Sequence, residues 1–519
     1  MKSRNVRKMI IISALLFSVT AGLTTANLVY ATPPAKPSGS SQGGGTSSKD
    51  ITYSGQYEFS ESVSKSGDEY TTDAGGKNTI LARDGTINFS NVTISKTGDE
   101  DNGDSSDFYG TNAAVLSIGT SKIKISNSKV TTAAKHANAV FAYGDSTIDI
   151  SDSTIKTTEN NSGGIMVTGG GTVNVTNLEV ETDGNSSAPI RSDRGGGTMN
   201  VSGGSYKSNG VGSPVIYSTA DVIVSGGAKL EATVSEGAVI EGKNSISLDN
   251  VEVVVNNTKL NSNSETYKAF FIYQSMSGDA SEGTGTFTMK NSKVTNEHGE
   301  IFFITNTTAN ISLSKNQIKN NDEDGVFLKA TSGKWGSDGK NGGDVTLTSE
   351  YEPLEGDIVI DKISTLDASF KNRTSYKGAI NAENTAKNVK ITLDSSSRII
   401  LTGDSYISEL SNEVADNSNI FANGHKLYVA GEEVSINQEI PETWDYDFAT
   451  ESTEPVEEEE EANKDNLYLL LGAFSFAFVV ALIVTISIIV KNKHDKQEHI
   501  EKKALEKVQN NMKKPWEKA

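Results

Sequence analysis

A short apolar motif returns every 25 residues through the middle of this chain. A repeat of roughly 20–50 residues is the signature of a solenoid, in which each structural unit packs only on its neighbours. We therefore predict a stack of similar coils between residues 51 and 432. The first copies of the motif are Ala113-Ala114-Val115-Leu116, Asn138-Ala139-Val140-Phe141, Gly163-Gly164-Ile165-Met166, Ala188-Pro189-Ile190-Arg191 and Ser213-Pro214-Val215-Ile216.

Each coil also contains a second segment in which apolar and polar residues alternate. This period-two pattern predicts a strand with one buried and one solvated face. A residue that tolerates left-handed backbone follows each strand, as a tight corner requires. The alternating pairs are Ile123/Ile125, Ile148/Ile150, Val173/Val175, Met199/Val201, Val222/Val224, Ile246/Leu248, Phe287/Met289, Ile311/Leu313 and Val345/Leu347. The corner residues are Asn127, Asp152, Asn177, Gly203, Gly226, Asn250 and Asn291.

A third short strand follows the corner, with Val130, Ile155, Val180 and Tyr206 in register. Three strands per coil without helical periodicity predict an all-β fold, a right-handed parallel β-helix of about fourteen coils. A β-propeller is the main rival, but its repeat is nearer 40 residues.

The two ends of the chain have the features of an exported, membrane-anchored protein. Residues 1–31 are predicted to be a signal peptide, because basic residues precede an apolar stretch and a Val29-Tyr30-Ala31 cleavage site. Leu467 to Val490 has no charged residue and is long enough to span a bilayer. The basic tail, 491–519, is then expected in the cytoplasm and the N-terminal domain outside the cell. A flexible Pro/Ser/Gly leader is predicted over 32–50 and an acidic stalk over 433–466.

Charge and composition exclude several classes of function. The formal net charge is −20, which argues against nucleic acid as a partner because nucleic-acid binding requires a basic surface. The chain has no Cys, which excludes disulfides and thiolate chemistry. We predict no catalytic residues. The group Arg191, Asp193 and Arg194 has only one acid, and no paired carboxylates for glycoside hydrolysis stand out from the general acidity.

Three segments resemble a family of right-handed parallel β-helix surface proteins of Gram-positive bacteria, often called adhesin-like and similar to the pectate-lyase-like solenoid. They are Gly212 to Asn244 (GSPVIYSTADVIVSGGAKLEATVSEGAVIEGKN), Trp335 to Leu347 (WGSDGKNGGDVTL) and Leu401 to Val429 (LTGDSYISELSNEVADNSNIFANGHKLYV). The resemblance covers about 51–432 and implies the fold and a surface location. It implies little about chemistry, since β-helices host lyases, hydrolases and binding modules alike.

The loop DEDNGDSSD is a candidate calcium site. Its closely spaced Asp, Asn and Gly residues supply hard oxygen ligands on a tight backbone, which suits Ca²⁺. It lacks the spacing and the terminal Glu of an EF-hand, so a solvated acidic loop is the alternative. The predicted ligands are Asp99, Asp101, Asp104 and Asp107.

The first strand of each coil has apolar residues in two adjacent columns, which cannot both face one core. The first column, from Val115 onward, is predicted to face inward. The second contains Arg191 and is predicted to face outward, as an exposed apolar platform that binds a ligand. Cover by residues 51–70 or by the long turns after Asn256 and Gln274, or a bulge that turns both columns inward, are the alternatives. The predicted platform comprises Phe141, Arg191, Ile216, Phe271 and Phe303.

Together these features predict a membrane-anchored cell-surface protein that binds a polysaccharide or another surface polymer through many small contacts. A polysaccharide lyase or hydrolase of the β-helix type is one alternative. A structural or signalling ectodomain is another. No cofactor other than calcium is suggested by the residues.

Overall fold

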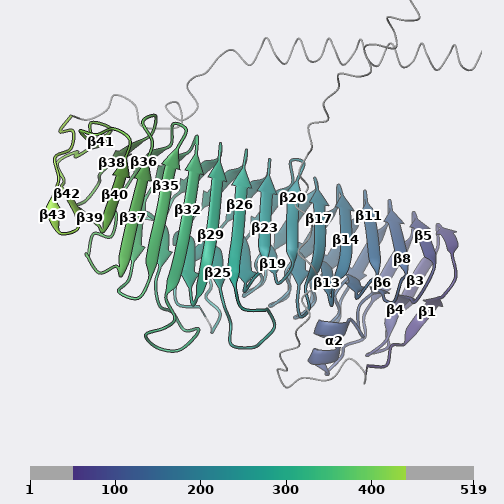
Figure 1. Cartoon of the computed structure of the whole chain (residues 1–519). Coiled ribbons are helices and arrows are strands. Elements are labelled where there is room, and N and C mark those ends of the chain that lie inside the picture. Colours follow the sequence, from purple (N-terminus) through teal and green to yellow (C-terminus); the bar gives the residue numbers. More distant parts are fainter. Residues whose placement is uncertain (1–50, 263, 440–519) are drawn as a thin grey trace, which may run out of the picture.

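The computed structural model describes residues 51–262 and 264–439, which form one long parallel β-solenoid (Figure 1). Each strand hydrogen-bonds to its equivalents one coil before and after it, and not to its neighbours in sequence. The largest sheet has 14 strands, close to the predicted number of coils. The all-β, parallel-solenoid prediction is therefore confirmed.

Sheet A contains the first strand of each coil and is the sheet on which the candidate site lies. Its strands, in order along the solenoid, are β1 (Gly55–Phe59), β4 (Asn78–Ala82), β7 (Val115–Ser117), β10 (Val140–Tyr143), β13 (Ile165–Thr168), β16 (Ile190–Ser192), β19 (Ile216–Ser218), β22 (Ala238–Glu241), β25 (Lys268–Tyr273), β28 (Glu300–Thr305), β31 (Val326–Ala330) and β34 (Asp357–Ile360).

Sheet B contains the alternating strands. They are β2 (Val63–Ser66), β5 (Thr86–Ser90), β8 (Lys122–Ser126), β11 (Thr147–Ser151), β14 (Gly171–Thr176), β17 (Gly197–Ser202), β20 (Asp221–Ser225), β23 (Ser245–Asp249), β26 (Thr284–Lys290), β29 (Thr307–Ser314), β32 (Gly343–Glu350), β35 (Thr365–Lys371), β37 (Asn388–Leu393) and β40 (Glu409–Asn412). All nine predicted apolar pairs are buried on its inner face.

Sheet C contains the third strands, and Val130, Ile155, Val180 and Tyr206 are buried in register there, as predicted. Its strands are β3 (Glu69–Thr72), β6 (Thr93–Lys96), β9 (Lys129–Thr132), β12 (Thr154–Thr157), β15 (Glu179–Thr182), β18 (Ser205–Ser208), β21 (Lys229–Ala232), β24 (Glu252–Val255), β27 (Lys293–Asn296) and β30 (Gln317–Asn320).

Two small sheets belong to the C-terminal coils, and they are β33 (Pro353–Glu355), β36 (Ser375–Lys377), β38 (Arg398–Ile400) and β41 (Ile420–Phe421), then β39 (Ser405–Ile407), β42 (Leu427–Val429) and β43 (Glu432–Glu433). The strand β43 runs antiparallel to β42 and covers part of that end. A further bridge joins Phe421 to Asn437, so backbone pairing continues a few residues into the predicted stalk.

The corners between β-strands are made as predicted. All seven predicted corner residues have positive φ, from 47° at Asp152 to 71° at Gly226. Polar side chains stack from coil to coil on the solvated side, as where the Asn200 amide donates to Asn174 at 2.9 Å and the Asn174 amide to Asp149 at 2.8 Å. The corners and the ladders together hold successive coils in one register.

The two columns of sheet A do face opposite sides, but the register differs from the prediction. Ile190 pairs with Ile216, and Arg191 pairs with Tyr217. The coil between them has one extra residue in the turn at Gly195–Gly197, which a constant spacing of 25 residues does not count. Ile216 therefore belongs to the inner column and Tyr217 to the outer one.

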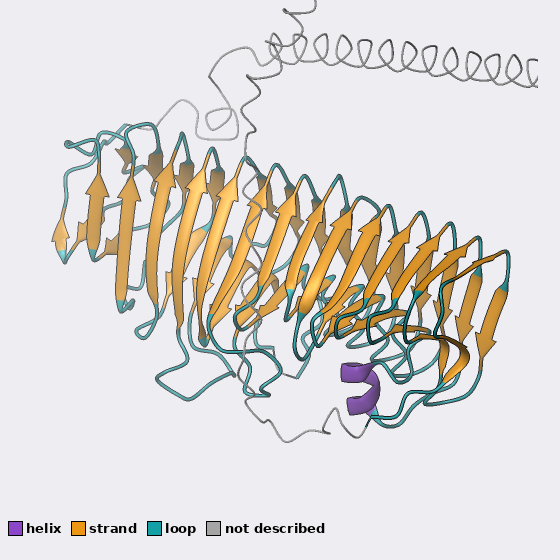
Figure 2. Cartoon of the chain, turned by 45° about the vertical axis from the view of Figure 1, so that its right-hand side comes forward, coloured by secondary structure: helices purple, strands orange, loops and turns teal. Residues whose placement is uncertain are grey.

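Within the described ranges, no helix is long and apolar enough to cross a bilayer. The predicted span Leu467 to Val490 lies outside those ranges, as do the predicted signal peptide, the leader, most of the stalk and the tail. A short helix, α2 (Gly103–Tyr109), lies beside sheet A near the N-terminal coils (Figure 2).

Candidate functional site

The outer face of sheet A is covered rather than open. Near the N-terminal coils, Leu81, Leu116, Phe141 and Met166 form an apolar cluster separate from the main core, and all four are fully buried. The segment containing α2 makes this cover. A Cβ on Gly110, at the end of α2, would lie 3.0 Å from the Phe141 ring, and Thr168 donates to the backbone oxygen of Phe108 at 2.7 Å.

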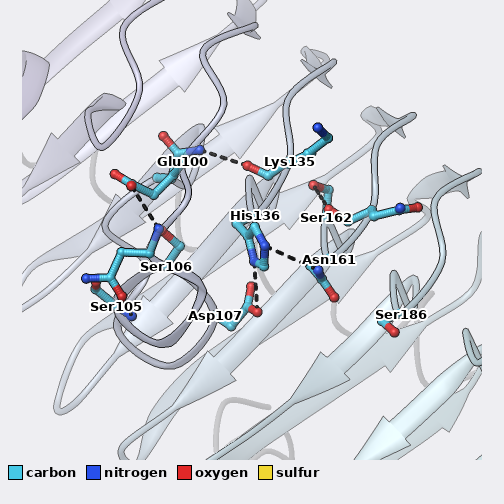
Figure 3. A network of polar contacts seen from close by, with 12 residues as sticks. Glu100, Ser105, Ser106, Asp107, Lys135, His136, Asn161, Ser162 and Ser186 are labelled. Carbon is cyan, nitrogen blue, oxygen red and sulfur yellow. Dashed lines mark hydrogen bonds and ion pairs between the residues drawn. The ribbon is translucent and has the colours of Figure 1, made fainter. Parts of the chain in front are cut away.

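A polar network fixes α2 in this position (Figure 3). The imidazole Nδ1 of His136 lies 3.0 Å from an Asp107 oxygen, and its Nε2 lies 3.3 Å from the Asn161 amide. The hydrogen bond to Asp107 raises the pKa of His136. His136 is therefore a docking residue of the cover rather than a solvated turn residue.

The four predicted calcium ligands do not converge. Asp107 contacts His136, and Asp99 accepts from the Lys135 backbone at 2.8 Å, while Asp101 is exposed and Asp104 lies in the first turn of α2. In the part of the chain that is described, no group of three or more His, Asp or Glu side chains is placed to hold a metal. Calcium binding by this loop stays a prediction, which melting curves with and without millimolar Ca²⁺ would test.

Three insertions cover the outer face of sheet A further along the solenoid. They are loop 256–267, loop 274–283 and loop 331–342, which follow β24, β25 and β31. Beneath them, Val239, Phe271, Tyr273 and Phe303 form a second apolar cluster, against which Tyr217 and Trp335 pack. Two of these loops are the long turns after Asn256 and Gln274 that were one predicted source of cover.

The prediction of an exposed platform is therefore wrong for its five residues. Phe141 and Ile216 are fully buried, Phe271 is 8% and Phe303 5% exposed, and Arg191 is 9% exposed. Ile216 faces the core because of the extra residue in the Gly195–Gly197 turn. The others do face outward, but α2 and the loops lie over them.

A pocket of about 240 Å³ remains where the three loops meet over β19, β22 and β25. Its apolar walls include Val239, Phe271 and Trp335, so one residue of the predicted platform does reach it. Its polar lining includes carboxylates and hydroxyl groups. These are Glu236, Glu241 and Asp279, together with Tyr217, Tyr273, Ser264, Ser275 and Ser277.

Glu241, at the end of β22, is the central carboxylate of this pocket. Its side chain is 1% exposed and accepts from the hydroxyls of Tyr217, Ser275 and Tyr273, the last at 3.0 Å. Burial, followed by the charges nearby, raises the pKa of both tyrosines well above the usual range. Both phenols therefore keep their protons and remain donors to the carboxylate.

The other two carboxylates of the pocket have basic partners. Glu236 lies 3.3 Å from the ammonium of Lys268, which is itself 1% exposed. Asp279 lies 2.5 Å from Arg194, whose guanidinium stacks 3.7 Å from the centre of the Phe108 ring. Through Arg194, loop 274–283 is joined to the α2 cover.

Asp193 adds a buried acid next to this group. It is 5% exposed, and its carboxylate lies 3.4 Å from Arg191. Burial raises the pKa of Asp193 to about 7, against the lowering effect of Arg191, and the charges of Asp279 and Glu241 raise it further. The sequence group Arg191, Asp193 and Arg194 is therefore part of a larger acidic centre.

Sequence reasoning identified the arginine pair but missed Glu241, Asp279 and Trp335. One signal was present. Glu241 places a carboxylate at a strand position where the paired coils have Tyr273 and Thr305. The irregular spacing after Glu241 also marked the insertions, but spacing alone does not tell where a loop folds back.

Comparisons of the chain with protein-family models, with curated proteins and with solved structures find no match. The parallel β-solenoid is shown by the structure. The adhesin-like resemblance has no support from a family match.

Proposed function

We propose that this chain is a cell-surface binding protein whose loop-covered pocket holds one unit of a polysaccharide or another surface polymer. The pocket is the observation that supports this proposal. Small-ligand sites are concave, with aromatic walls and a few placed polar groups, and this pocket has Phe271 and Trp335 beside Glu241. Its volume is below the ~300–1,000 Å³ of drug-sized sites, which suits a single unit of a larger chain.

The surface location rests on the two ends of the sequence. An N-terminal segment with the features of a signal peptide and the apolar stretch Leu467 to Val490 place the solenoid outside the cell and the C-terminus in the cytoplasm. Protease added to intact cells should then remove the solenoid, and protection of the solenoid would contradict the proposed topology.

A hydrolase of the β-helix type is the second candidate, because three carboxylates line one pocket. Glycoside hydrolysis requires two carboxyl groups on either side of the scissile bond. Release of reducing ends from a bound polymer, abolished by Glu241→Gln, would favour this candidate. A polymer that is bound and not cleaved favours the binding protein.

Replacing Trp335 by Ala should weaken polymer binding about 30-fold. Trp335 packs 5.3 Å from Tyr273, between ring centres, and forms one wall of the pocket. Aromatic residues in such positions contribute about 2 kcal/mol or more to binding. A glycan array probed with the purified full chain identifies the polymer, and titration of that polymer measures the change.

Met276→Ala is the matched control, because Met276 is 70% exposed in loop 274–283 and does not line the pocket. It should leave affinity unchanged. Equal affinity of the Trp335 variant and the unmodified chain for every bound glycan would show that the pocket is not the binding site.

A further inference from the structure

The charges around the pocket do not balance. Glu236 is paired with Lys268, Asp279 with Arg194 and Asp193 with Arg191. Glu241 differs from these three. Over residues 51–262 and 264–439, no Lys, Arg or His forms an ion pair with its carboxylate, although it is 1% exposed. A buried carboxylate without a positive partner is costly, because burial removes its hydration.

The groups around Glu241 are donors that orient its carboxylate. Three hydroxyls, from Tyr217, Tyr273 and Ser275, point at its oxygens. Hydroxyl donors satisfy part of the hydrogen-bonding capacity of a carboxylate but do not neutralise its charge. The site is thus shaped for an anion that still lacks a cation.

The rings of the pocket favour a cation as well. Phe271 and Tyr273 stack with ring centres 4.4 Å apart, and Tyr273 contacts Trp335. The Lys268 ammonium already lies 4.8 Å from the centre of the Phe271 ring, which shows that this cluster accommodates a positive charge. The rings of Tyr273 and Trp335 remain for a ligand.

We propose that the polymer unit bound in the pocket carries a protonated amine and that Glu241 is the counterion of this amine. The inference rests on the proposed function and names its ligand class, a polymer of sugars with free amino groups. The acidic chain, with a net charge of −20, attracts such a polycation over a longer range. Glu241 and the rings then select the amine at short range.

The experiment compares two ligands that differ only in the charge of the amino group. Glucosamine oligomers and N-acetylglucosamine oligomers of the same length are titrated into the purified full chain. We expect the free-amine oligomer to bind at least tenfold more tightly. Equal or tighter binding of the acetylated oligomer would overturn the amine proposal and leave the proposed polymer-binding function standing.

A variant pair then assigns the effect to Glu241. Glu241→Gln keeps the shape and the acceptor oxygen but removes the charge, and should lower affinity for the amine oligomer at least tenfold. Glu179→Gln, at an exposed position of β15, should leave it unchanged. If Glu241→Gln does not fold, the comparison of the two oligomers on the unmodified chain still decides. Failure of both oligomers, together with an empty glycan array, would instead reject the proposed function.

Discussion

Replacing Phe141 by Ala should lower the free energy of unfolding by about 3–5 kcal/mol, as is typical for a fully buried Phe. Phe141 lies on the outer face of sheet A, paired with Leu116 and Met166 on the neighbouring coils. It is fully buried because the α2 segment lies over it. Truncation would leave a cavity between two rigid layers that can collapse only in part. Urea unfolding, followed by circular dichroism, measures the change.

Ile223→Ala is the matched control for this result. Ile223 is an apolar residue on the outer face of sheet B, and it is 46% exposed. Its truncation should change stability by less than about 1 kcal/mol. A similarly small change for Phe141 would mean that the α2 cover is open in solution, as the exposed-platform interpretation requires.

Replacing Glu352 by Gln should remove a large pH dependence of stability. Glu352 is fully buried, and its carboxylate accepts from the backbone and the side-chain amide of Asn316, the former at 3.0 Å. Burial raises the pKa of Glu352 to about 8, although the hydrogen bonds from Asn316 lower it. The group thus holds its proton in the folded chain at pH values at which the unfolded chain has lost it.

The direction of the effect follows from this raised pKa. The contribution of Glu352 to stability is complete below its unfolded pKa, 4.5, and is lost as the pH rises through about 8. The loss is of the order of 2–5 kcal/mol, since each pKa unit corresponds to about 1.4 kcal/mol. Glu352→Gln has no proton to lose, so it should be more stable than the unmodified chain at pH 9 by a similar amount.

Urea unfolding of both proteins between pH 4 and pH 9 measures this difference. Glu252→Gln, at an exposed position at the start of β24, is the control and should follow the unmodified chain at every pH. Parallel curves for Glu352→Gln and the unmodified chain would show that the Glu352 carboxylate is not held in a dry environment.

Much of the fold could be predicted from local pattern. Ile148 and Ile150 face the core because residues two apart in a strand point to one side, and Asp152 turns the corner because it tolerates a φ of 47°. These rules need no knowledge of distant residues. The strand order and the inward faces of sheets B and C follow from them.

The register of sheet A was harder to predict, because it depends on the length of turns outside the strand. One extra residue in the Gly195–Gly197 turn moves Ile216 to the core and Tyr217 to the outer face. In a strand, a shift of one residue reverses the side on which every side chain lies. The predicted binding column was therefore correct up to Arg191 and shifted beyond it.

The sequence by itself determined the repeat, the three strands of each coil, their corners and the inner faces, because all of these are encoded over a few neighbouring residues. Only the tertiary structure decided that the outer face of sheet A is covered, and that Asp193, Glu241 and Asp279 lie in one acidic centre. The physical reason is the stacking of coils. It brings together residues separated by whole coils, while the inserted loops fold back according to contacts that exist only once the solenoid has formed.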